Sequence, residues 1–163
     1  MLGGCASPAP SLSSRPELQA SDPARFGIPE TIGQWQLRTT VEPITSDSPV
    51  GAMIAEAGGD AATATDVTVH VSGGPDTFAF DTLRVPGVTL EAFTPAAAQR
   101  IAAFGATQRS EISVAGWKVV RYATPADWAG PPEVFFFTFR QGVIYTFRGV
   151  TEEQLSALLT GLT

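Results

Sequence analysis

Two runs of β-branched and aromatic residues near the C-terminus constrain the fold more than any other stretch of this chain. Glu133–Arg140 reads EVFFFTFR and Val143–Arg148 reads VIYTFR, with Gln141-Gly142 between them. Runs of this composition form strands, and two such runs joined by a short link that contains glycine form an antiparallel hairpin. The sequence therefore predicts an antiparallel hairpin over these two runs.

The link between these two runs allows two strand registers. A two-residue loop sets Phe135 opposite Arg148 and mixes an arginine into an aromatic face. A three-residue loop over 140–142, with Gly142 in the left-handed conformation, sets Phe135 opposite Phe147 instead. A shift of one residue moves every side chain to the other face of a strand. Because only the second register gives one consistent apolar face, we predict the three-residue loop.

Two helices are predicted from their terminal residues. Thr151-Glu-Glu-Gln154 is a capping box, and a leucine stripe follows it at helical spacing, which predicts a helix over about 151–161. Thr94 as N-cap, Pro95 at the first helical position and Gly105 beyond the end predict a second helix over about 94–105.

The remaining apolar segments alternate as strands do. The clearest is Asp66–Ser72, whose three valines share one face, and Val50–Glu56 is a weaker strand candidate. Further strands are expected from Gly33, over 107–114 and over 116–122. These elements predict a single α+β domain over 26–163, mainly an antiparallel sheet with both helices packed on one face.

The N-terminus carries the lone cysteine of the chain. Leu2-Gly3-Gly4-Cys5 resembles the lipobox that ends the signal peptide of a bacterial lipoprotein. The resemblance covers residues 1–5 and implies a diacylglyceryl group on the Cys5 sulfur, and hence an anchor in a membrane of the bacterial cell envelope. Ala6 in place of aspartate favours the outer membrane. Only Met1 precedes the motif, so we expect Met1 not to be the true start.

Residues 6–25 are rich in serine, proline and alanine and show no apolar periodicity, so they are expected to form a disordered tether. One cysteine cannot form an internal disulfide or a cysteine-clamped zinc site. We therefore expect no metal and no cofactor. The net charge of −6 argues against a general nucleic-acid-binding protein.

The bases concentrate in residues 82–151 and the acids in 26–81. This asymmetry indicates either solvated faces or a cationic patch for an anionic partner. The residues of such a patch would be Arg84, Arg109, Lys118, Arg121, Arg140 and Arg148.

We expect no catalytic residues. His70 lies on the outer face of its strand with Asp66, and four residues along a strand separate the two by ~13 Å, too far for an orienting hydrogen bond. An enzyme whose groups converge only in three dimensions remains an alternative, and a deep pocket that holds an acid with a perturbed pKa would favour it.

The candidate binding site is the loop 123–132, which presents Trp128 among proline, glycine and alanine. The tryptophan either plugs the edge of the core, which we favour, or contacts a partner. Lys118, Arg121 and Arg140 lie on adjoining strands and would suit an anionic ligand or a protein partner. The function we expect is that of a membrane-tethered, non-enzymatic binding domain. The alternatives are an enzyme and a soluble intracellular domain with an incidental Cys5.

Overall fold

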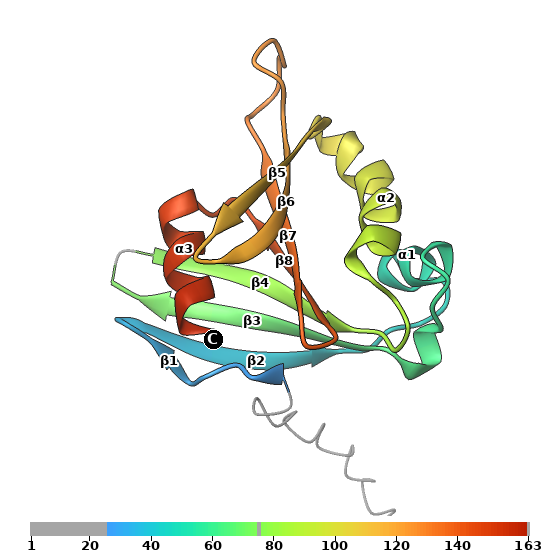
Figure 1. The fold of residues 1–163 in the computed structure, drawn as a ribbon, viewed down its shortest axis with the longest axis horizontal. Helices are drawn as coiled ribbons and strands as arrows, with labels where there is room; N and C mark the ends of the chain where they lie inside the picture. The colour runs from blue at the N-terminus through green and yellow to red at the C-terminus, as the bar shows by residue number, and fades with distance from the viewer. Residues whose placement is uncertain (1–25, 75, 163) are drawn as a thin grey trace, which may run out of the picture.

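A computed structural model describes residues 26–74 and 76–162, and the expectations for residues 1–25 lie outside this range. Within the described residues, eight strands form one open antiparallel sheet in the order β1-β2-β3-β4-β8-β7-β6-β5 (Figure 1). The strands are β1 (Thr31–Ile32), β2 (Trp35–Glu42), β3 (Thr65–Gly73), β4 (Asp76–Arg84), β5 (Gln108–Val114), β6 (Trp117–Ala123), β7 (Val134–Arg140) and β8 (Val143–Arg148). With the helices α1 (Pro49–Glu56), α2 (Leu90–Ile101) and α3 (Glu152–Gly161), the α+β class is confirmed.

The strand order consists of two consecutive four-strand meanders joined through their last strands. Strand β4 ends the first meander, β8 ends the second, and the two pair antiparallel with Phe80 opposite Phe147. The two phenylalanine rings lie 4.9 Å apart between centroids, and both are buried. A buried aromatic pair therefore lies at the junction of the two halves.

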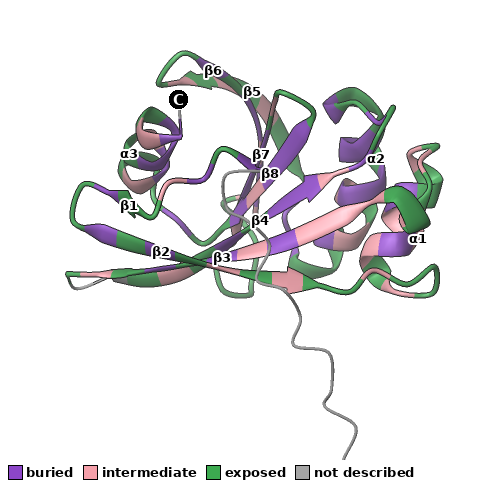
Figure 2. Cartoon of the chain, turned by 90° about the horizontal axis from the view of Figure 1, so that it is seen from below, coloured by how far each residue is buried: buried purple, intermediate pink, exposed green. Residues whose placement is uncertain are grey.

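The helices lie on opposite sides of the second meander (Figures 1 and 2). Leu155, Leu158 and Leu159 of α3 belong to a core cluster with Phe136, whereas α1 and α2 pack with Phe135 and Phe137. Neighbouring residues of β7 thus point into two different cores. The expectation that both predicted helices pack on one face is not confirmed.

The predicted hairpin register is wrong. Strands β7 and β8 pair with Phe135 opposite Arg148 and Phe137 opposite Thr146, which leaves the two-residue turn Gln141-Gly142. Both turn residues have positive φ, 51° and 80°, as the favoured two-residue hairpin turn requires. The prediction assumed one apolar face. Because helices cover both faces of this hairpin, the aromatic residues need not share a side.

The C-terminal helix is confirmed, including its capping box between Thr151 and Gln154. Helix α2 begins at Leu90 with Thr89 as its N-cap, and not near Thr94 as predicted. Thr94 is buried and Pro95 lies inside the helix. A 3₁₀ turn over Ala102–Phe104 extends the helix to Gly105, where a left-handed φ of 78° ends it as predicted.

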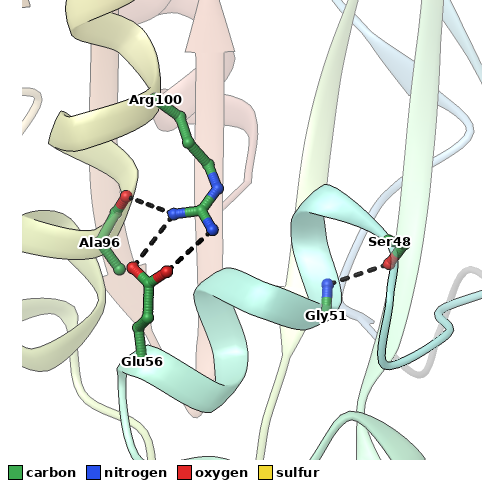
Figure 3. Close-up of polar contacts among 5 residues, drawn as sticks. All are labelled: Ser48, Gly51, Glu56, Ala96 and Arg100. Carbon is green, nitrogen blue, oxygen red and sulfur yellow. Dashed lines mark hydrogen bonds and ion pairs between the residues drawn. The ribbon is translucent and has the colours of Figure 1, made fainter.

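The predicted strand over Val50–Glu56 is wrong, because this segment forms α1. Ser48 caps the helix by accepting a hydrogen bond from the Gly51 N–H, and Pro49 occupies the first turn (Figure 3). A side chain at Gly51 would collide with the Thr45 carbonyl oxygen, so the residue permits a close approach of the preceding loop. Helix α1 then lies beside α2.

Candidate binding site

An apolar pocket of about 240 Å³ lies between the helix pair α1–α2 and the sheet. The helices contribute apolar side chains, and the floor crosses strands β3, β4, β8 and β7. The pocket is lined by Pro49, Val50, Met53, Asp66, Asp81, Leu83, Phe93, Ala97, Arg100, Ile101, Phe135, Phe137 and Thr146.

The pocket forms where the helical cover of the sheet ends. On this face, Phe135 and Phe137 of β7 are buried beneath the helices, whereas Thr40 of β2 and His70 of β3 are exposed. The cross-strand pairs Thr68–Asp81, Asp81–Thr146 and Thr146–Phe137 form one row from the polar to the apolar part of the sheet. A ligand in the pocket would therefore meet phenyl rings at one end and carboxylates at the other.

Two aspartates of adjacent strands lie at the polar edge of the pocket. Asp66 pairs with Leu83, and two residues further along β3 Thr68 pairs with Asp81, so the two carboxylates are diagonal neighbours on one face. Diagonal neighbours in a sheet stand ~7–8 Å apart at the backbone, within reach of each other's field. The Thr68 hydroxyl donates a 2.8 Å hydrogen bond to Asp81 Oδ1.

Asp66 is the most perturbed acid of this pocket. Burial is the main cause that raises its pKa from the ordinary 3.8 to about 7, and the negative charges of Asp81 and Glu42 add to the effect. A hydrogen bond from the Val67 N–H acts in the opposite direction. The raised pKa therefore brings the ionisation of Asp66 close to neutral pH.

Arg100 also lines the pocket, but Glu56 of α1 holds its guanidinium group (Figure 3). The two side chains form a bidentate pair with distances of 3.1 and 3.0 Å, and Arg100 Nη1 also donates to the Ala96 carbonyl. This pair lowers the pKa of Glu56. The pair joins α1 to α2 above the pocket, and the negative charge of Glu56 compensates the positive charge of Arg100.

A second hollow, of about 800 Å³, lies between the β1–β2 turn and α3. Its lining is more mixed and includes Gly33, Gln34, Thr151 and Glu153. The smaller pocket has a floor of buried aromatic rings and holds an acid with a raised pKa, which is the combination expected of a binding site. We therefore place the candidate site under α1 and α2.

The residues of the sequence-predicted site make separate contacts. Trp128 is 44% exposed, and its indole ring lies against Gly105 and Gly130. Lys118 lies 3.6 Å from Glu111, and Arg121 lies 3.8 Å from Glu152. Arg140 stacks on the Trp117 ring at 4.7 Å. The contacts of these three basic residues are thus with groups other than Trp128.

A different arginine stands beside the aromatic side chains near the end of α2. Arg148 lies 4.4 Å above the ring of Phe104, which is 44% exposed, and 5.4 Å from that of Phe135. Glu133 accepts two hydrogen bonds from the Arg148 guanidinium group, and the arginine lowers the pKa of this glutamate. The arginine is thus already engaged within the domain.

His70 is exposed on β3 and pairs with Arg38 and Ala79, in agreement with its predicted place on the outer face. Within residues 26–74 and 76–162, no group of three or more histidine, cysteine, aspartate and glutamate side chains is arranged to hold a metal ion. Cys5 lies outside these ranges. In the same ranges, no helix is long and apolar enough to cross a membrane.

Sequence reasoning placed Asp66 on the outer face of its strand but did not identify the pocket. The signal that would have found it is Ser48-Pro49, a helix start that places Val50 and Met53 on a helix above the sheet. No family model, curated protein or solved structure matches this chain. The fold defines the chain as an α+β domain with an open antiparallel sheet and a pocket beneath two helices.

Proposed function

We propose that residues 26–163 form a non-enzymatic ligand-binding domain, which the N-terminal segment tethers to a membrane of the bacterial cell envelope. The observation that supports binding is the pocket between α1, α2 and the sheet. Its apolar lining and its few polar groups at one edge are typical of small-molecule sites. The floor is preformed by strands whose aromatic residues are buried in the core.

The size of the pocket limits its ligand. A cavity of about 150 Å³ lined by apolar side chains admits benzene. The pocket, at about 240 Å³, therefore has room for a ring with a short chain or for a branched alkyl group. Ligands of this size include small aromatic metabolites and single apolar side chains of peptides.

Binding is tested with three probes that share one ring, namely propylbenzene, 3-phenylpropanoate and 2-phenylethylamine. Met53 lines the pocket, so its methyl signal in ¹H–¹³C NMR reports occupancy. We expect a saturable shift of this signal with at least one probe. Ala97→Leu fills the pocket and should abolish the shift, whereas Ala92→Leu on the exposed side of α2 should preserve it. Failure of all three probes, or equal binding by Ala97→Leu, would contradict the proposal.

The tether is proposed from the lipobox-like residues 2–5 and the Ser/Pro/Ala-rich residues 6–25. Two or three acyl chains on Cys5 would give stable anchoring, whereas one chain alone would bind reversibly. Expression from the gene with its own upstream DNA, in the presence of an alkyne-labelled palmitate, should label the protein. Cys5→Ser should remove the label, and fractionation of the membranes would then test the preference for the outer membrane. Absence of label in the unaltered protein would favour the intracellular alternative.

An enzyme is the second candidate function, because Asp66 lines a pocket and its pKa is raised to about 7. A carboxyl group with this pKa suits general acid–base catalysis near neutral pH. Incubation with p-nitrophenyl esters and glycosides tests this candidate. Release of p-nitrophenolate that Asp66→Asn abolishes, with the fold retained, would favour the enzyme over the binding domain.

A further inference from the structure

We propose that the pocket beneath α1 and α2 selects ligands that join an apolar group to a protonated amine, with Asp66 and Asp81 as the acceptors of the ammonium group. This inference rests on the proposed binding function and adds the chemical class of the ligand. The pocket supports it, because its lining includes phenyl rings of β7 and, across β8 on the same face of the sheet, Asp81 of β4 and Asp66 of β3.

The apolar end takes the uncharged part of the ligand. Phe135, Phe137 and Phe93 are each at most 5% exposed and line the cavity together with Ile101. A buried aromatic wall stabilises a ring or alkyl group through removal of apolar surface from water, at roughly 25 cal/mol per Å². It offers no hydrogen bond to a polar group, so the charged part of a ligand must lie at the other end.

The charged groups at the other end are mainly acidic. Asp66 comes from β3, Asp81 from β4, and Glu42 pairs with Asp66 from β2. From the helices, Arg100 of α2 faces the pocket, but its charge is balanced by Glu56 of α1. Arg38, His70 and Arg148 lie on the same face, one row of paired residues further from Asp66, and Glu133 holds the guanidinium group of Arg148. The charges nearest to Asp66 are therefore the carboxylates of Asp81 and Glu42, and this edge attracts an ammonium group and repels a carboxylate or phosphate.

Protonation links the amine to Asp66. In the free protein the pKa of Asp66 is about 7, because burial and two neighbouring carboxylates disfavour its charge. A bound ammonium group favours the ionised carboxylate, so binding releases the Asp66 proton. Affinity for an amine should therefore rise with pH through the range in which Asp66 ionises, as long as the amine remains protonated.

The test compares 2-phenylethylamine with propylbenzene and 3-phenylpropanoate on the whole chain, with the Met53 methyl signal as the readout. At pH 8 we expect the amine to bind at least about tenfold more tightly than propylbenzene, as one charge-assisted hydrogen bond would provide. We expect 3-phenylpropanoate to bind most weakly. The preference for the amine should shrink at pH 5.5.

Matched variants assign the preference to the two aspartates. Asp66→Asn and Asp81→Asn should each reduce it to about twofold, while Asp127→Asn in the exposed β6–β7 loop should leave it unchanged. Equal binding of the amine and propylbenzene, with no effect of Asp66→Asn, would overturn the amine inference and leave the pocket as a binding site. No binding of any probe would overturn both the inference and the proposed function.

Discussion

Asp66 links the candidate pocket to the stability of the domain. Its folded-state pKa is raised to about 7, so between about pH 4 and 7 the folded protein binds this proton more tightly than the unfolded chain does. The contribution of Asp66 to stability is therefore fully present below its unfolded pKa and is lost as the pH rises to about 7. Above that pH, folding retains the cost of a partly buried carboxylate.

Asp66→Asn should accordingly stabilise the protein at pH 8 and have little effect at pH 4. For a dry group the pKa difference would correspond to about 4 kcal/mol. Because Asp66 is partly exposed, solvent screening reduces the expected gain to on the order of 1–2 kcal/mol. Urea denaturation at the two pH values measures the difference, and Asp127→Asn serves as the control. An equal effect of Asp66→Asn at both pH values would refute this assignment.

For single residues, the sequence predicted which side chains are exposed, but it did not predict which side chains lie close together. The alternation of Asp66–Ser72 correctly placed the valines in the core and His70 outside. The strand pattern could not place Asp81 beside Asp66, because that depends on the register between β3 and β4 across a turn that contains Gly73 and Gly74. The raised pKa follows from this register and from the helices above it.

Among the helices and strands, the sequence rule for a helix start gave a correct result at one position and a wrong result at another. Ser or Thr followed by Pro marks a helix start, and it holds for Ser48-Pro49 but not for Thr94-Pro95. Helix α2 continues through Pro95 because Leu90 and Phe93, upstream of it, are buried against the sheet. Tertiary packing thus moved one predicted boundary, and the helix signal of α1 was obscured by an apolar run that also suits a strand.

Two hairpin turns have the same backbone conformation, and the residue at the first turn position of each is poorly suited to it. Ala115 and Gln141 have φ of 50° and 51°, and each precedes a glycine with positive φ. Asparagine adopts this conformation more readily than alanine or glutamine, and Asn-Gly is the preferred pair for such turns. Ala115→Asn and Gln141→Asn should each raise the free energy of unfolding by about 0.5–1 kcal/mol, measured by urea denaturation.

The control for these turn variants is Ala126→Asn in the β6–β7 loop, which should change stability little. The β7–β8 turn also tests the strand register. In the three-residue alternative, Gln141 would not occupy the first position of a two-residue turn. A destabilising Gln141→Asn variant, with Ala115→Asn stabilising, would contradict the register found here.

At the scale of the molecule, the join between the two meanders could not be predicted from local patterns. Consecutive strands pair within each meander, although α1 lies between β2 and β3, but the pairing of β4 with β8 connects residues 59 to 67 positions apart. The leucine stripe of α3 predicted an apolar partner surface, and Phe136 and Phe147 provide it. That a second apolar face exists, under α1 and α2, follows only once the sheet is assembled.

The junction should make the domain unfold as one unit. Phe147 is fully buried against Phe80, so Phe147→Ala should lower the free energy of unfolding by about 3–5 kcal/mol, whereas Phe139→Ala at a 39% exposed position should lower it far less.

Trp35 reports on the first meander and Trp117 on the second, once the other two tryptophans are replaced by phenylalanine in each reporter variant. Both reporters should give the same denaturation midpoint, and Phe147→Ala should shift them together, because Phe80, Phe147, Trp35 and Trp117 belong to one core cluster that spans both meanders. The milder Phe147→Leu keeps the measurement accessible if the alanine variant does not fold. Separate midpoints for the two tryptophans would show instead that the meanders are independent folding units joined at a weak seam.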